Sequence, residues 1–158
     1  MEQYFEEYEL EPDMEAILRH GGTRRKTEAE KAFGIANPYA VRAVENYLLN
    51  YDTYQKMICM NRYEKAYFAA IHSRATEIAE EKEEYLRAKL YEIRAFILSL
   101  PDCNEKLFLY YYYVHGESIM RCAEMLYVSR ATAYRLKKSA LHTAAYYYHL
   151  YENAEVGS

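Results

Sequence analysis

The sequence has no tryptophan, and glycine, proline and cysteine are scarce, with five, three and three residues in a chain of 158. Few glycines and prolines leave little chain for turns and loops, which predicts a nearly all-helical protein. Cys59, Cys103 and Cys122 are far apart and form no Cys-x-x-Cys pair, so neither a disulfide framework nor a zinc site is indicated. We expect Cys122 to be a small core residue.

Long apolar runs and catalytic motifs are also missing. No run approaches the roughly 18 apolar residues of a membrane span, and the N-terminus, MEQYFEE, is too acidic for a signal peptide. We therefore expect a cytoplasmic protein that does not contact a membrane. The five histidines lack metal-ligand spacing, no nucleophile lies in a glycine-framed turn, and no phosphate-binding loop is present. The sequence predicts no enzyme activity, no metal and no cofactor.

Charge is unevenly distributed along the first part of the chain. Residues 1–16 hold seven acidic side chains and no basic one, which is typical of a mobile tail or a short, poorly anchored helix. A basic patch of Arg19, Arg24, Arg25 and Lys26 follows and flanks Gly21-Gly22. This patch could contact DNA phosphates or pair with the acidic tail of its own chain. We expect residues 1–36 to be a flexible acidic tail and basic linker, and residues 151–158 to be a second flexible tail.

Two long helices are expected between residues 37 and 100. Asn37 can cap a helix that has Pro38 in its first turn and extends to about residue 71. A second helix is expected from about 74 to 100. The apolar stripe of the first helix contains Val41, Val44, Leu48, Tyr51, Ile58 and either Met57 or Tyr54, and that of the second contains Leu86, Leu90, Ile93, Ile97 and Leu100. Such seams form a helical hairpin within one chain or a coiled coil between chains, and pairing between chains would give a homodimer.

The segment 118–141 has the pattern of a helix-turn-helix. Its apolar positions fall at helical spacing on either side of a short break: Ile119, Cys122, Ala123, Leu126, Val128, Ala133, Leu136 and Ala140. Ser129 stands at the break, where its hydroxyl can accept a hydrogen bond from a free backbone amide of the second helix.

The second helix carries four basic residues and no acidic one, whereas the whole chain has a formal net charge of −4. A basic amphipathic helix can simply be a solvated surface. It can also enter a DNA major groove, where its N-terminal side chains meet base edges and flanking cations meet phosphates. The candidate DNA-binding residues are Ser129, Arg130, Ala131, Thr132, Tyr134, Arg135, Lys137 and Lys138.

A third helix is expected before these two. Leu100-Pro101-Asp102 ends one helix and opens the next, an aromatic helix follows over 104–115, and Gly116 breaks it. Three short helices in this order support a helix-turn-helix. The expected fold is therefore all-α, with a long helical hairpin or coiled coil over 37–100 followed by a trihelical helix-turn-helix domain over 101–150.

Residues 100–141, about a quarter of the chain, resemble region 4 of the sigma-70 family. The matching segments are Leu100-Pro101, Gly116-Glu117-Ser118, Ala123-Glu124-Met125-Leu126, Val128-Ser129-Arg130 and Tyr134-Arg135-Leu136-Lys137-Lys138-Ser139-Ala140-Leu141. Within that family the segment is most similar to small sigma-like regulators of phages and mobile elements, including the ArpU and RinA groups.

The resemblance implies that the second helix recognises a promoter element or operator. It places Arg130, Thr132, Arg135 and Lys138 at positions that usually touch DNA. Tyr127 departs from the family pattern, which keeps glycine at this turn because the backbone adopts positive φ, at a cost of about 1 kcal/mol for other residues. We therefore expect a reshaped turn.

The predicted function is transcription regulation through sequence-specific binding of double-stranded DNA, with RNA polymerase as a second candidate partner. Two alternatives stay open. A phage terminase small subunit also joins a helix-turn-helix to oligomerising helices. A protein-docking module that contacts RNA polymerase would not bind DNA, and would use surface tyrosines from the runs at 110–113 and 146–148 as contacts.

Overall fold

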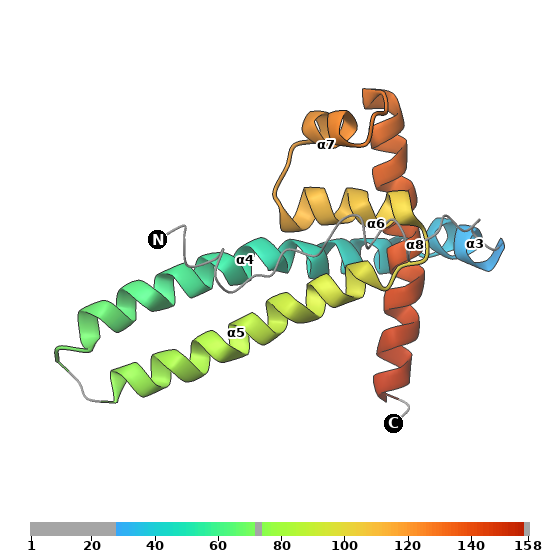
Figure 1. The fold of residues 1–158 in the computed structure, drawn as a ribbon. Coiled ribbons are helices and arrows are strands. Elements are labelled where there is room, and N and C mark those ends of the chain that lie inside the picture. Colours follow the sequence, from blue (N-terminus) through green and yellow to red (C-terminus); the bar gives the residue numbers. More distant parts are fainter. Residues whose placement is uncertain (1–27, 72–73, 157–158) are drawn as a thin grey trace.

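A long pair of helices projects from one end of a helical cluster (Figure 1). The structure is a computed structural model that describes residues 28–71 and 74–156, and this part of the chain is helical with no β-strand. The elements are α3 (Glu28–Ala36), α4 (Pro38–Phe68), α5 (Ala75–Leu98), α6 (Cys103–Leu109), the π-helix η1 (Tyr110–Val114), α7 (Ile119–Met125) and α8 (Arg130–Val156). The all-α prediction is confirmed for these residues.

Helices α4 and α5 pack against each other within the chain. Four of the five apolar residues expected on the seam are buried on α5, and the fifth, Leu100, is buried just after it. Val44, Leu48, Tyr51 and Ile58 of α4 are buried as well. Tyr54 is half-buried against this core, whereas Met57 is exposed. Farther out, the Asn61 side chain donates a 2.7 Å hydrogen bond to the carbonyl of Ala79, and Arg62 pairs with Glu83.

The start of α4 differs from the expectation. Asn37 does occupy the N-cap position and Pro38 the first turn, but the Asn37 side chain makes no capping hydrogen bond. Its amide nitrogen instead donates to the carbonyl of Phe33, at 2.9 Å. Asn37 therefore closes the preceding helix α3, which the sequence pattern did not predict.

That helix also corrects the expectation of a flexible linker up to residue 36, because α3 packs along α8. The Phe33 ring lies 5.7 Å from the Tyr146 ring and 4.9 Å from the His149 ring, centroid to centroid. Gly34 is buried against His142. The expected acidic tail and the basic patch at 19–26 lie outside the described residues.

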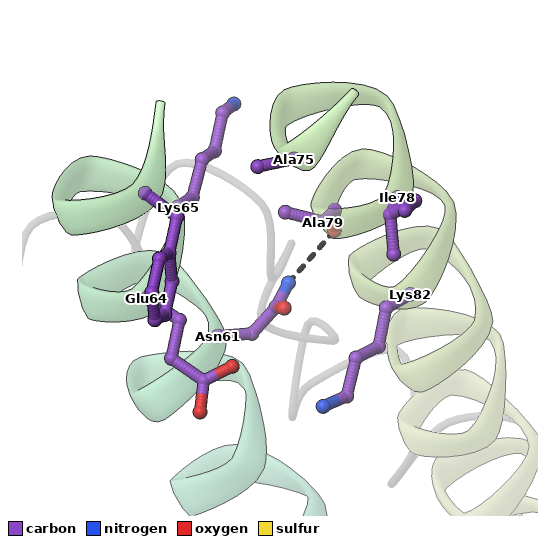
Figure 2. Close-up of a pocket in the computed structure, with 8 residues that line it drawn as sticks. Asn61, Glu64, Lys65, Ala75, Ile78, Ala79 and Lys82 are labelled. Atoms are coloured by element: carbon purple, nitrogen blue, oxygen red, sulfur yellow. Dashed lines mark hydrogen bonds between the residues drawn. The ribbon is translucent and has the colours of Figure 1, made fainter. Parts of the chain in front are cut away.

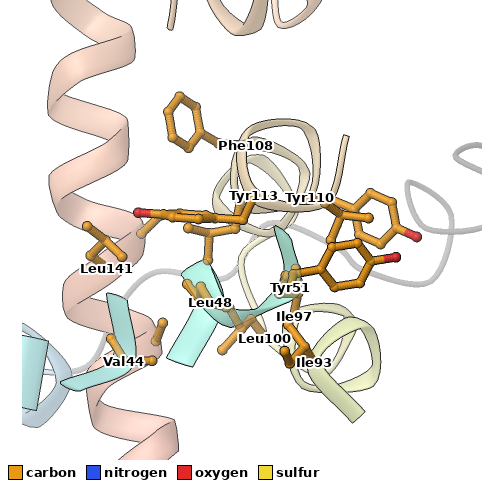
Figure 3. Packing of buried hydrophobic residues seen from close by; sticks show 14 of the residues in the cluster. Val44, Leu48, Tyr51, Ile93, Ile97, Leu100, Phe108, Tyr110, Tyr113 and Leu141 are labelled. Atoms are coloured by element: carbon orange, nitrogen blue, oxygen red, sulfur yellow. The ribbon is translucent and has the colours of Figure 1, made fainter. Parts of the chain in front are cut away.

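One hydrophobic core connects the long helices to the C-terminal ones. Tyr110 and Tyr113 of the first tyrosine run are buried, and Figure 3 shows the Tyr113 ring reaching from η1 over Leu48 towards Leu141 of α8. The helix α8 is longer than expected and stays helical to Val156, so the tail predicted at 151–158 is helical up to that residue. The second tyrosine run, 146–148, is half-buried, with Tyr148 packed against Tyr47.

Candidate nucleic-acid interface

Side-chain caps fix where the last three α-helices begin. Asp102 accepts a hydrogen bond from the backbone amide of Glu105 at 3.0 Å, and Ser118 accepts one from Arg121 at 3.1 Å. Ser129 accepts one from the amide of Thr132 at 3.1 Å, which confirms the cap predicted for the basic helix. Each cap satisfies an amide that has no partner within its own helix, an effect of about 1 kcal/mol.

The connection between α7 and α8 is a tight turn with a defined hydrogen-bond pattern. The amide of Val128 donates to the carbonyl of Ala123 at 3.0 Å, and the amide of Tyr127 donates to Glu124 at 3.2 Å. These two bonds form a Schellman motif, which needs a left-handed residue at the Tyr127 position. Tyr127 has φ 56° and is 95% exposed. The expectation of a reshaped turn is therefore wrong: tyrosine adopts the conformation that glycine would, and its ring points into solvent.

The first turns of α8 separate buried from exposed residues. Ala133 and Ala140 are fully buried, and Leu136 packs partly buried on the same core. The opposite side is formed by the predicted site residues. Ser129, Arg130, Ala131, Tyr134, Arg135 and Lys138 are exposed, whereas Thr132 and Lys137 are half-buried. We call the set Arg130, Ala131, Tyr134, Arg135 and Lys138 the basic face.

Contacts within the basic face place its two arginines differently. The Arg130 guanidinium lies 5.8 Å from the centre of the Tyr134 ring, a weak cation–π distance. Arg135 approaches the hydroxyl of Thr132 at 3.5 Å, and that hydroxyl also receives a 2.8 Å hydrogen bond from Ser129. Thr132 is therefore engaged at the helix start, and the sequence alone did not indicate this.

Lys137 lies at the edge of the basic face, beside the π-helix. Its ammonium is 4.8 Å from the centre of the Tyr112 ring and 3.5 Å from the Tyr112 hydroxyl. The tyrosine run in η1 thus holds this lysine at the edge of α8. Of the eight predicted site residues, Thr132 and Lys137 are the two that are half-buried rather than exposed.

An acidic side chain lies next to the basic face. Glu45 of α4 lines a hollow of about 240 Å³ together with Tyr134, Lys137 and Lys138. Its carboxylate accepts a 3.2 Å hydrogen bond from the Tyr113 hydroxyl. Burial, together with the negative charge of Glu45, raises the pKa of Tyr113, so this hydroxyl stays protonated and remains a donor. Glu45 is thereby held towards η1.

The support beneath the basic helix includes a buried carboxylate that sequence reasoning missed. Glu105 of α6 is only 2% exposed and accepts hydrogen bonds of 2.8 Å from Ser139 and from Thr143, both on α8. Its position three residues after Asp102 is the spacing of a capping box, which predicts an exposed residue of a first helical turn. Only the approach of α8 reveals its role in positioning that helix.

The structure also has a hollow outside the basic face. A second hollow, of about 390 Å³, lies between the outer ends of α4 and α5, where the Asn61 side chain bonds to the Ala79 carbonyl (Figure 2). Over residues 28–71 and 74–156, no three His, Cys, Asp or Glu side chains meet as a metal site requires. In the same ranges, no helix is both long and apolar enough to cross a membrane.

Comparison of the chain with protein-family models, with curated proteins and with solved structures found no match.

Proposed function

We propose that this protein is a sequence-specific DNA-binding transcription regulator that uses α7, its tight turn and α8 as a helix-turn-helix. The observation that carries the proposal is the basic face. It combines three cations with no acidic residue over 129–141, on a helix whose start is fixed by the Ser129 cap and by the Tyr127 turn. The resemblance of residues 100–141 to sigma region 4 supports the same function.

The exposure and position of each residue on α8 indicate which part of the DNA it would contact. Arg130, Ala131 and Arg135 lie near the helix start and are exposed, as residues that read base edges in the major groove must be. An arginine that contacts guanine with two hydrogen bonds contributes about 1–3 kcal/mol of discrimination between bases. Lys138 is suited to phosphate contact. Lys137 would first have to leave the Tyr112 ring.

Phosphate contacts alone would give weak binding by a single copy. Each phosphate neutralised adds roughly −0.9 to the slope of log affinity against log salt concentration. With three exposed cations on the basic face, selectivity must therefore come from base contacts or from a second basic face in the same complex. In the first case the side chains of Arg130 and Arg135 decide which sequence is bound.

The test is selection of binding sequences from random double-stranded DNA, followed by fluorescence anisotropy at several salt concentrations. We expect one enriched motif, which the wild type binds at least about tenfold more tightly than scrambled DNA. The Arg130→Ala/Arg135→Ala variant should lose this selectivity. The Lys82→Ala/Lys89→Ala variant removes two positive charges from α5 and should keep it.

Two results would contradict the proposal. One is the absence of any enriched sequence after selection. The other is equal binding by the wild type and the double arginine variant, because the basic face would then contribute nothing. Either result would favour a protein-docking role for these helices.

A further inference from the structure

The long helix α4 has a second apolar side that the fold leaves uncovered. Large apolar residues lie on the side away from Val44, Leu48 and Tyr51, and each is at least 39% exposed. We call them the outer face of α4: Leu49, Met57, Met60, Tyr63 and Tyr67, with Ile71 in the turn just after the helix. From Leu49 to Tyr67 this face extends roughly 27 Å at 1.5 Å per residue.

One buried side is enough to hold a helix in a monomeric fold. The core side of α4 already supplies that contact through its packing on α5. Continuous exposed apolar side chains on a soluble protein usually mark a contact with another macromolecule. Both the methionines and the tyrosines of the outer face are enriched in such interfaces.

The order of residues on this face favours a second copy of the chain as its partner. Several residue pairs at equal distances on either side of Met60 match in character. Leu49 and Ile71 are both apolar, and so are Met57 and Tyr63, whereas Thr53 differs from its counterpart Tyr67. The charged pair is complementary, because Lys56 on one side corresponds to Glu64 on the other.

We infer that the outer face of α4 binds the same face of a second copy, antiparallel, with a two-fold axis at Met60. A two-fold interface brings residue i against residue j and residue j against residue i. It therefore sets Lys56 beside Glu64 of the other copy twice, and it sets Met60 against its own equivalent. Parallel pairing would instead place Lys56 opposite Lys56 and Glu64 opposite Glu64, an arrangement of like charges that is unfavourable.

The charged residues are available for this contact. The ammonium of Lys56 pairs with Asp52 at 2.8 Å within α4, but the two side chains are 77% and 62% exposed. A pair this exposed contributes little, so Lys56 can exchange or share its partner at small cost. Glu64 is likewise exposed, where the outer face of α4 borders the hollow between α4 and α5. The inference concerns association of the chain and does not depend on DNA binding.

Sedimentation velocity of the full chain without DNA tests the interface. The wild type should sediment as a dimer of the 18.8 kDa chain at micromolar concentration. Met60→Glu places two carboxylates at the two-fold axis and should raise the dimer dissociation constant at least about tenfold. The control is Tyr91→Glu on α5, where the native ring is 68% exposed but lies off this face, and it should leave the dimer intact.

A charge exchange tests the pairing of Lys56 with Glu64. Lys56→Glu and Glu64→Lys should each weaken the dimer, because each creates two like-charge contacts. The double variant Lys56→Glu/Glu64→Lys should restore most of the wild-type affinity. Independent, additive losses in the double variant would overturn the pairing.

Cysteine crosslinking tests the register and direction. In a Cys59→Ser background, Met60→Cys should form a disulfide between copies, since the two-fold axis brings this position against itself. Tyr67→Cys should not, because its two copies would be about 20 Å apart along the helices, whereas a disulfide needs Cα atoms about 5.5–6 Å apart. A monomeric wild type, a dimer insensitive to Met60→Glu, or crosslinking through Tyr67→Cys would each overturn the inference.

Discussion

The carboxylate of Glu105 lies 2.8 Å from the hydroxyl of Thr143, and both residues are buried, at 2% and 0% exposure. The contact joins α6 to α8 one helical turn beyond Ser139, which donates to the same carboxylate. A buried carboxylate without donors is costly, so these hydroxyls constrain where α8 can lie against α6. Because the basic face lies at the start of α8, this contact also fixes the position of the basic face.

Replacing the Thr143 hydroxyl should therefore destabilise the fold. Thr143→Val keeps the shape of the side chain but removes a donor to Glu105, and we expect the free energy of unfolding to fall by about 1–3 kcal/mol. Thr143→Ser retains the hydroxyl and is the matched control, with a smaller loss. Urea unfolding followed by circular dichroism measures both. Equal stability of Thr143→Val and the wild type would show that the hydrogen bond is not required.

Gly34 is a second position where a small change should have a large effect. In an exposed helix, alanine is more favourable than glycine by about 1 kcal/mol. At Gly34, however, an added Cβ would lie 2.6 Å from the Cβ of His142, a distance that forces α3 away from α8. Gly34→Ala should therefore lower stability and increase amide hydrogen exchange in α3. Ile35→Ala, at a position that is 76% exposed, is the control and should leave α3 protected.

Features decided by near neighbours along the chain were predictable from the sequence. The seam of α5 follows from apolar spacing, and the Ser129 cap follows from a hydroxyl placed just before a helix. Asn37 shows the limit of this reasoning, because its amide could cap α4 or close α3. The choice depends on α3, whose packing on α8 is a tertiary contact.

The candidate site was predictable to the same extent. Helical spacing identifies which residues of α8 share an exposed side, but it cannot show what approaches that side from elsewhere. Lys137 contacts Tyr112, a residue 25 positions earlier, and Glu105 meets Thr143 across 38 positions. Both contacts require the path of α6 and η1 beside α8, which no local pattern encodes.

The buried Cys122 thiol should be unreactive and should make stability depend on alkaline pH. Burial, with a smaller effect from Glu117, raises the pKa of this thiol from 9.0 to about 11. Well below pH 9 the thiol is protonated in both states and stability is unaffected. Between about pH 9 and 11 the unfolded chain loses the proton while the folded chain keeps it, so stability falls.

Comparison of the wild type with Cys122→Ala over this pH range isolates the contribution of the Cys122 thiol to the loss of stability. All other groups titrate in both proteins, so their contributions cancel. The variant should lose less stability between pH 9 and 11 than the wild type. At neutral pH, iodoacetamide should label the half-buried Cys59 before Cys103 and Cys122, which are buried. Rapid labelling of Cys122 in the folded protein would contradict this account.

The Tyr127 ring is 95% exposed, whereas the Tyr127 backbone lies in the left-handed region that closes α7. A residue with a Cβ at φ 56° costs about 1–2 kcal/mol relative to a relaxed conformation. Glycine has no such cost at this turn, so Tyr127→Gly should raise the free energy of unfolding by up to about 1 kcal/mol, because the added freedom of the unfolded chain offsets part of the gain. Tyr127→Ala keeps the Cβ and should leave stability close to that of the wild type.

The same two variants separate the backbone role of Tyr127 from a role for its ring. With 95% of its surface exposed beside the start of α8, the ring could contact DNA or a partner protein. If so, Tyr127→Gly and Tyr127→Ala should both weaken binding to the selected DNA, even though only the glycine variant is more stable. In Tyr127→Gly, stability would then rise while affinity for DNA falls. Thermal unfolding and anisotropy on the same samples therefore distinguish the role of the backbone from that of the ring. Unchanged affinity in both variants would mean that the strained turn serves only to connect α7 to α8.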